Sequence, residues 1–239
     1  MEKKYALSAV SYGEVLFDLF PTHKKIGGAP LNVALRMKSL GVQSKIISKV
    51  GLDEEGSEIF DYLKSKEMDV SFIQKSKEYK TGVVHVMINE KGNASYDIAY
   101  PSAWDKIEQN DELKAVVSSS DVFIFGSLIC RDEVSRSTLF SMIKQANYTV
   151  FDVNLRQPYY IKENLIDLMK ASDFIKLNDE ELLELSQMLA SPFHSFEQNI
   201  RFIASQMGAS QICVTKGAFG AVLFYNDKFY YNSGYFIKV

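Results

Sequence analysis

The chain of 239 residues is poor in the residues that build metal centres and disulfide frameworks. Its two cysteines, Cys130 and Cys213, stand singly beside apolar runs, so there is no disulfide pattern and no Cys-x-x-Cys motif. The three histidines have no ligand spacing. We therefore interpret both thiols as buried structural groups and expect no metal site built on histidine.

Strong net charge and long apolar runs are also absent. A formal net charge of -3 and a pI near 5.7 give no broad attraction for nucleic acid or anionic membranes. No apolar run approaches the ~20 residues of a membrane helix, and the first residues turn polar too early for a signal peptide. We expect a soluble, cytoplasmic protein that binds neither nucleic acid nor membrane.

The apolar residues that are present, 46% of the chain, are enough for a large core. From about residue 110, strand-like runs at 122–126, 148–153, 174–178 and 211–215 alternate with helix-like runs. This alternation favours a mostly parallel sheet with helices on both faces. We expect one doubly wound α/β domain over residues 1–239.

Residues 81–100 have a different pattern. Two alternating stretches flank a Lys-Gly-Asn turn, which predicts a β-hairpin. With the strand-like residues of about 12–24, this hairpin is expected to form a small second sheet that serves as a lid. Tyr96, Ala103 and Trp104 are candidates for residues that close over a ligand. Another hairpin is expected to turn at Asn226 and Asp227.

Small or polar residues follow each of the four later strands. In an open parallel sheet the carboxyl ends of the strands share one edge, and ligands bind there. Four such ends in succession therefore predict a common cleft. The residues are Gly126 and Ser127; Asp152, Asn154 and Arg156; Asn178 and Glu181; and Thr215, Gly217 and Gly220.

The stretch FDVNLR places Asp152, Asn154 and Arg156 at alternate positions. In an extended segment their side chains share one face. One interpretation is a strand end with a local Asp–Arg ion pair. The other is an arginine held ready for an anionic oxygen, either of a phosphate or of a sugar acid.

The other two strand ends are also open to two interpretations. Asn178 and Glu181 have the spacing of a helix N-cap with its capping box, or alternatively place a carboxylate near a hydrated Mg²⁺. Thr215, Gly217 and Gly220 form either a plain β-turn or a bare backbone that a phosphate can approach. The last stretch matches neither the P-loop nor the dinucleotide-binding pattern.

The stretch KKIGGAPLNVALRMKSLGV puts two glycines before a helix-like run. Gly27 and Gly28 leave the main chain accessible, and Asn32 and Arg36 are one helical turn apart. With Asp18 at the end of the preceding strand, these residue types are typical of the recognition of a neutral polyol. A tight turn before an amphipathic helix is the alternative.

The motifs GEVLFD, IGGAPLNVA, FGSL, FDVNLR, KLNDEEL and VTKGAFGA, in this order, resemble the ribokinase-like sugar kinases, the PfkB carbohydrate kinase family. The similarity is closest to the fructokinase branch. The resemblance implies a doubly wound sheet with a β lid, which forms a homodimer in some relatives. It also implies phosphorylation of a sugar hydroxyl, most fittingly of fructose, with ATP and Mg²⁺.

The resemblance also implies roles for individual residues. The sugar is held by Asp18, Gly27, Gly28 and Asn32, and Arg156 lies near the sugar or the transferred phosphate, where a catalytic role is open to it. Glu181 binds Mg²⁺ through water. The nucleotide is bound by Asn178, Thr215, Gly217 and Gly220.

One family motif is missing from residues 1–239. Family members carry a Gly-Ala-Gly-Asp motif whose aspartate is the general base, and no such string occurs here. A general base typically contributes ~10²–10⁴-fold to the rate. We therefore expect little or no kinase activity from a chain that ends at Val239.

Three other functions are compatible with parts of this pattern. A 2-keto-3-deoxygluconate kinase would use Arg156 to meet the carboxylate of its substrate. A non-catalytic sugar-binding or regulatory protein would keep only the sugar site. An NAD-dependent oxidoreductase is disfavoured because no strand is followed by the Gly-x-Gly-x-x-Gly pattern.

Overall fold

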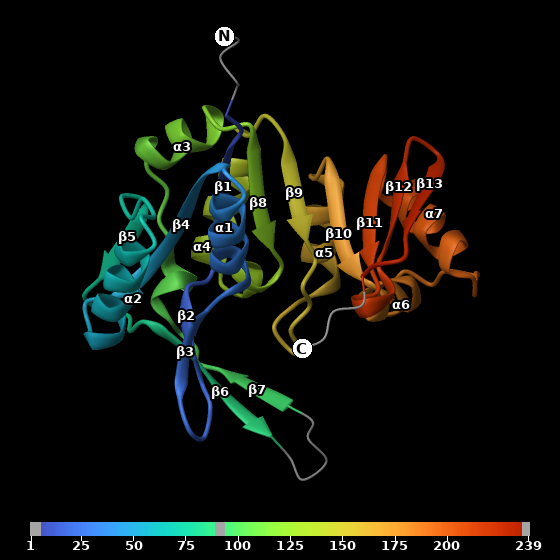
Figure 1. The fold of residues 1–239 in the computed structure, drawn as a ribbon. Helices are drawn as coiled ribbons and strands as arrows, with labels where there is room; N and C mark the ends of the chain where they lie inside the picture. Colours follow the sequence, from blue (N-terminus) through green and yellow to red (C-terminus); the bar gives the residue numbers. More distant parts are fainter. Residues whose placement is uncertain (1–5, 89–93, 236–239) are drawn as a thin grey trace. The chain divides into compact units, whose positions relative to one another are not determined.

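A computed structural model describes residues 6–88 and 94–235 of the chain. The chain divides into two compact units, which are described separately below. Unit 1 comprises residues 1–125 and 129–147, and unit 2 comprises residues 126–128 and 148–239. Figure 1 shows the course of the chain through the elements of each unit.

Unit 1 is built on a parallel sheet in the order β8-β1-β4-β5. Figure 1 shows helix α1 in front of this sheet and α4 behind it, so helices cover both faces, as the alternating pattern predicts. The strands are β1 (Ser8–Tyr12), β4 (Gln43–Gly51), β5 (Ile73–Ser76) and β8 (Val122–Gly126), and the helices are α1 (Ala29–Ser39), α2 (Glu54–Ser65), α3 (Asp111–Ser118) and α4 (Glu133–Ile143).

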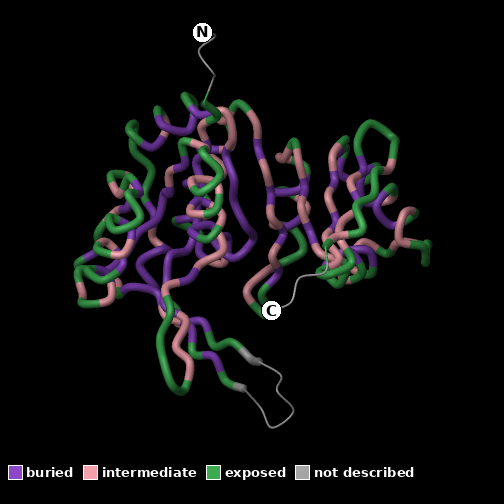
Figure 2. Tube along the Cα trace, viewed as in Figure 1, coloured by how far each residue is buried: buried purple, intermediate pink, exposed green. Residues whose placement is uncertain are grey.

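The central strands of this sheet are buried on both faces. In β1 and β8 every residue after the first is buried, because helices pack on either side. A second layer of the core lies under α1 and α2, where Leu31 and Ile59 are fully buried against Ile46 and Val50 of β4. Figure 2 shows these strands as the buried centre of the unit.

A smaller sheet in unit 1 has the order β3-β2-β6-β7. Its strands are β2 (Leu16–Leu19), β3 (Lys24–Gly27), β6 (Gly82–Ile88) and β7 (Ala94–Ile98). The hairpin expected over 81–100 is confirmed by the antiparallel pairing of β6 with β7, and its turn lies outside the described residues. The role of this small sheet as a lid stays a prediction.

The start of β6 is tied to helix α2 by the carboxylate of Asp53. This side chain caps α2 through the N–H of Gly56 at 2.8 Å, and it also accepts from the N–H and the hydroxyl of Thr81 at 2.8 and 2.6 Å. Burial alone would raise the pKa of Asp53, but these hydrogen bonds outweigh it and hold the pKa below its ordinary value of 3.8.

The lowered pKa of Asp53 predicts a loss of stability in acid. The stabilisation is complete above the unfolded pKa of 3.8 and is lost as the pH falls through the lower folded pKa. We expect Asp53→Asn to lower the free energy of unfolding at pH 6, and we expect this difference from the parent protein to shrink as the pH falls below about 4. Urea unfolding at pH 3 to 6 measures the free energy of unfolding of both proteins, and Asp61→Asn, on the exposed face of α2, is the control. A difference that stayed constant with pH would contradict the prediction.

Unit 2 contains the parallel strands β9, β10 and β11, followed by the antiparallel strands β12 and β13. Their bounds are β9 (Thr149–Asp152), β10 (Phe174–Asn178), β11 (Gln211–Thr215), β12 (Ala221–Tyr225) and β13 (Lys228–Asn232). The helices are α5 (Lys162–Lys170), α6 (Asp179–Met188) and α7 (Phe196–Met207).

Alternation within these strands sets which face is buried. Ile175 and Leu177 of β10 and Ile212 and Val214 of β11 are fully buried, whereas the residues between them are partly exposed. Figure 1 shows α5, α6 and α7 behind the strands of unit 2. The buried residues therefore face the helices.

The last hairpin turns where the sequence predicts. Asn226 and Asp227 have φ values of 46° and 62°, which are the positive dihedrals of a two-residue hairpin turn. In residues 6–88 and 94–235, no helix is long and apolar enough to cross a bilayer.

Candidate functional site

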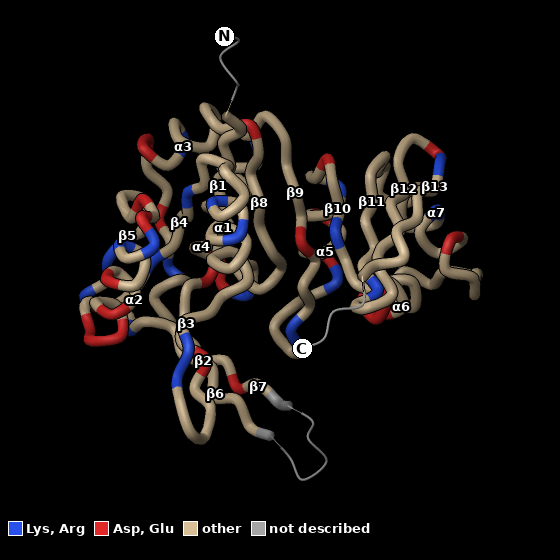
Figure 3. The backbone as a smooth tube through the Cα atoms, in the orientation of Figure 1, with Lys and Arg blue, Asp and Glu red and all other residues tan. Residues whose placement is uncertain are grey.

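Asp18 and Gly27 lie together on the small sheet. Asp18 of β2 is directly opposite Lys25 of β3, and Figure 3 shows the acidic and basic positions side by side on these strands. A side chain at position 27 would overlap the carboxylate of Asp18. The glycine therefore leaves the room that the carboxylate occupies.

Gly28 is the N-cap of α1 and has a φ of 111°, which disfavours every residue with a side chain. An added Cβ would also overlap the main-chain oxygen of Glu14. The first turn of α1 is capped from outside the helix, since the N–H of Ala29 donates to Oε1 of Glu14 at 3.2 Å. A carboxylate there is also favoured by the helix dipole.

Asn32 lies one turn into α1, where its N–H donates to the carbonyl of Gly28 at 3.0 Å. Its side chain is exposed, as is that of Arg36 one turn further on. Asp18, Gly27, Gly28 and Asn32, which we call the acceptor group, thus lie on β2, on β3 and at the start of α1. The structure offers there one carboxylate, one exposed amide and a bare main chain.

Sequence reasoning missed Glu14. The residue is only 3% exposed, and its capping role joins the β1–β2 connection to α1. The sequence feature that indicates a buried role for this residue is a single acidic residue between two apolar runs, in the motif GEVLFD. A charged group at such a position is rarely buried without a specific partner.

The carboxyl ends of β9, β10 and β11 form one edge of unit 2. Asn178 is the register partner of Thr215, and Asp152 that of Lys176. The hydroxyl of Ser127 donates to the carbonyl of Asn154 at 3.3 Å, which brings the segment after β8 to the same edge. The ends of β9, β10 and β11 and the segment after β8 thus share one edge of unit 2, and the common cleft expected there stays a prediction.

Glu181 connects two of these ends. It is 7% exposed, and its Oε2 accepts from the N–H of Asn178 at 2.8 Å while Asn178 Oδ1 accepts from the N–H of Glu181 at 2.7 Å. This reciprocal pair is the capping box that the spacing predicts. Its Oε1 accepts from the N–H of Leu155 at 2.9 Å, so the same carboxylate also fixes the segment after β9.

The expected arrangement of Asp152, Asn154 and Arg156 on one extended face is wrong. Strand β9 ends at Asp152, and Asn154 has a φ of 39°, which turns the chain out of the extended conformation. The interpretation of a local Asp–Arg ion pair is also wrong, because the ion pair of Asp152 is with Lys176, at 3.0 Å. Arg156 is exposed and donates to the carbonyl of Leu155 at 2.8 Å.

The stretch after β11 contains two glycines in different surroundings. Gly217 has a φ of 53° and nothing within 4 Å of an added Cβ, so its main chain is accessible. Gly220 has a φ of 86°, and a Cβ there would overlap the carbonyl of Asn232. Packing against the end of β13 therefore explains Gly220, whereas the main chain of Gly217 is open, and the hydroxyl of the half-buried Thr215 donates to the carbonyl of Leu177 at 3.4 Å.

Two of the three residues expected to close over a ligand lie outside the β6–β7 hairpin. Ala103 and Trp104 begin the short helix η1 (Ala103–Lys106) and are fully buried, so they do not belong to the β6–β7 hairpin. Tyr96 lies on β7 and is 53% exposed. Only Tyr96 of the three therefore has its side chain on the surface of the small sheet.

The thiols and possible metal ligands carry little chemistry in this structure. Cys130 is buried, and burial raises its pKa to about 12, which suppresses the reactive thiolate. Cys213 is half-buried, and burial raises its pKa as well. In the described part of the chain, no three His, Cys, Asp or Glu side chains gather into a group that could hold a metal ion.

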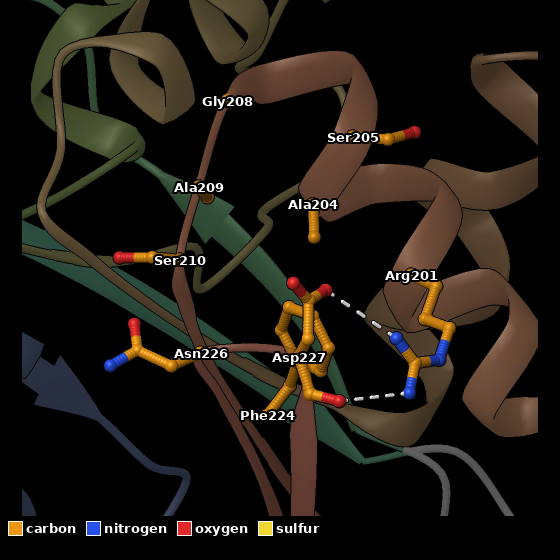
Figure 4. A pocket seen from close by; sticks show the side chains of 9 residues that line it. All are labelled: Arg201, Ala204, Ser205, Gly208, Ala209, Ser210, Phe224, Asn226 and Asp227. Carbon is orange, nitrogen blue, oxygen red and sulfur yellow. Dashed lines mark hydrogen bonds and ion pairs between the residues drawn. The ribbon is translucent and has the colours of Figure 1, made fainter.

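A surface pocket of about 520 Å³ lies in unit 2, between the C-terminal half of α7 and the β12–β13 turn. Figure 4 shows Arg201 reaching across it to Asp227, through contacts of 3.0 Å to the carbonyl and 3.5 Å to the carboxylate. It adjoins Ser210, just before β11 begins. It is therefore at the opposite end of the strand from Thr215, away from the predicted site residues.

Polar residues beyond the carboxyl ends of parallel strands are the arrangement in which open α/β sheets bind their ligands. Residues 2–239 match the model of the pfkB family of carbohydrate kinases, and the chain belongs to this family.

The sugar kinase of Pyrococcus horikoshii is 33% identical over 196 residues, which are 73% of this chain and 63% of that protein. The chain thus aligns with less than two thirds of that relative's length. Fructokinase of Escherichia coli is 25% identical over 236 residues, 93% of this chain and 75% of that protein.

Solved structures show the same fold. The uncharacterized sugar kinase of Pyrococcus horikoshii superposes with a TM-score of 0.82 at 27% identity, over 97% of this chain and 78% of that one. Fructokinase of Xylella fastidiosa with bound ATP also gives a TM-score of 0.82, at 22% identity, over 93% of this chain and 72% of that one.

Proposed function

We propose that the protein phosphorylates a hydroxyl group of a sugar with ATP, and that the sugar is fructose. The observation that carries this proposal is the acceptor group, in which Asp18 fills the space left by Gly27 beside the start of α1, whose N-cap Gly28 has no side chain. Membership of the pfkB family supports the reaction, and the relatives named fructokinase support the sugar.

In this proposal the acceptor group binds the sugar by hydrogen bonds. The carboxylate of Asp18 accepts from hydroxyl groups, and the amide of Asn32 both donates and accepts. Hydrogen bonds to a charged acceptor are about twice as strong as those between neutral groups. Asp18 is therefore the residue from which we expect most of the sugar affinity.

ATP fits the strand ends of unit 2. Gly217 offers an accessible main chain, Thr215 offers a hydroxyl, and the side-chain N–H₂ of Asn178 donates to no described residue. The fructokinase of Xylella fastidiosa, which shares the fold, holds ATP. We place the phosphates of the nucleotide near these groups, while Gly220 shapes the loop.

Mg²⁺ fits this site only as a hydrated ion. Both oxygens of Glu181 already accept main-chain N–H groups, so the carboxylate is placed to hold water molecules of the ion's shell. Mg²⁺ usually keeps several waters and takes its other ligands from substrate phosphates. When bound, the ion neutralises charge on the transferred phosphate.

A sugar acid is the second candidate substrate. Arg156 is exposed and forms no ion pair with a carboxylate in the described part of the chain, so its guanidinium is available for an anionic group. The substrate 2-keto-3-deoxygluconate would use it for its carboxylate, and fructose would leave it for the transferred phosphate. Formation of a homodimer through the small sheet stays a prediction.

We expect Asp18→Asn to weaken fructose binding by about 10- to 100-fold, the loss typical of a charged acceptor. Titration calorimetry with fructose and with 2-keto-3-deoxygluconate measures the effect. Asp97→Asn is the matched control, because Asp97 lies on β7 and pairs with His85 on the opposite face from Asp18. Failure of the parent protein to bind either sugar, or equal losses in both variants, would overturn the proposal.

A further inference from the structure

The guanidinium of Arg131 is buried in unit 1, far more deeply than a surface arginine. Its side chain is 4% exposed, and that of its partner Asp105 is fully buried. The two are joined by a pair of hydrogen bonds, from Nε to Oδ1 and from Nη2 to Oδ2, both 2.8 Å long. Burial raises the pKa of Asp105, and the neighbouring Arg131 opposes this rise.

The remaining donors of Arg131 reach the end of strand β7. Nη2 donates to the carbonyl of Ala99 at 2.7 Å and Nη1 to the carbonyl of Ile98 at 3.3 Å. Ile98 is the last residue of β7. Arg131 itself ends the short helix η2 (Leu128–Arg131), which directly follows β8 of the main sheet. One side chain thus joins the small sheet to the body of unit 1.

Trp104 supports the other strand of the hairpin. Its ring lies 4.0 Å from the guanidinium carbon of Arg131, in a cation–π contact, and its residue is fully buried. A side chain at Gly82, the first residue of β6, would overlap Nε1 of Trp104. The start of β6 therefore rests on the edge of the indole ring.

Strand β6 in turn places Asp18. β2 and β6 are parallel, with Leu16 opposite Gly82 and Asp18 opposite Val84. The register partner of Asp18 therefore lies on β6 two residues beyond Gly82, the residue that packs on Trp104. A displacement of the start of β6 is carried to Asp18 through the hydrogen bonds between the two strands.

We propose that Asp105, Trp104 and Arg131, which we call the base cluster, are positioning residues that set the place of the small sheet and thereby of the acceptor carboxylate Asp18. The effect on sugar binding rests on the function proposed above. The effect on the position of the small sheet does not depend on that function.

The geometry explains why arginine is needed. The guanidinium gives two parallel hydrogen bonds to Asp105, two more to successive carbonyls and a flat face to the indole. An ammonium group carries the same charge but has only three donors and no flat face. Arg131→Lys thus keeps the buried charge and removes most of the directed contacts.

Hydrogen exchange of the ligand-free protein tests the position of the sheet. In Arg131→Lys we expect amides of β6 and β7 to exchange at least 10-fold faster, while those of β1 and β4 keep their rates. Asn147→Ala is the matched control, because Asn147 also donates to two carbonyls in unit 1, those of Ser118 and Ser120. Unchanged protection of the hairpin, or an equal loss throughout unit 1, would overturn the inference.

Trp104→Phe supplies a second variant, since phenylalanine keeps an aromatic ring but removes the indole edge beneath Gly82. We expect the same local loss of protection, and a 5- to 10-fold weaker fructose affinity in both variants but not in Asn147→Ala. Affinity that is unchanged in both variants would overturn the positioning role while the proposed function stands. A parent protein that binds no sugar would refute the function, and the exchange rates would still decide whether the base cluster holds the sheet.

Discussion

Gly28→Ala is expected to lower the free energy of unfolding by about 2–5 kcal/mol and to abolish measurable sugar binding. A residue with a Cβ costs roughly 1–2 kcal/mol at a positive φ, and forced overlap in a packed region adds about 1–3 kcal/mol. Gly28 meets both conditions, since its φ is 111° and its Cβ would overlap the carbonyl of Glu14. Relief of this overlap would move the start of α1, where Asn32 and the cap from Glu14 lie.

Gly41→Ala separates the two effects. Gly41 has a φ of 86°, but an added Cβ there meets nothing within 4 Å. We expect it to cost only the roughly 1–2 kcal/mol of the unfavourable dihedral and to leave sugar binding intact. Urea unfolding and titration calorimetry on the two variants measure the difference. If the two substitutions had equal effects, close packing of Gly28 against Glu14 would be excluded as the cause.

Glu181→Ala is expected to lower the free energy of unfolding by about 2–5 kcal/mol and to weaken nucleotide binding at least 10-fold. The carboxylate accepts from the buried N–H group of Leu155 and from the partly buried N–H group of Asn178. Each buried donor left without an acceptor costs roughly 1–3 kcal/mol. The segment that carries Arg156 loses its tie to α6 at the same time.

The neighbouring residue gives the control for Glu181. Glu180 is exposed in the same turn of α6, and Glu180→Gln is expected to change the free energy of unfolding by less than about 0.5 kcal/mol. Glu181→Gln should fall between the two, because the amide retains one acceptor oxygen. Fluorescent-nucleotide titration and urea unfolding supply both readouts. Normal nucleotide binding by Glu181→Ala would show that the segment after β9 takes no part in the nucleotide site.

Elements with a strong local pattern were predicted correctly. The strands at 122–126, 174–178 and 211–215 and the turn at Asn226 and Asp227 lie where the sequence places them. Strand β5, with four residues and one buried apolar side chain, was not predicted, nor was α3. Such short segments carry too few residues for a period to show, and their pairing partners decide their conformation.

The amino-acid sequence by itself therefore determined three features: the class of fold, the capping box of Asn178 and Glu181, and the residue types of the acceptor group. Each of these depends on residues a few positions apart in the chain. Tertiary structure decided that Asp152 pairs with Lys176, that Glu14 caps α1 and that Trp104 lies under β6. These contacts join residues 15 or more positions apart, so their partners are set by strand pairing and packing. No local pattern contains that information.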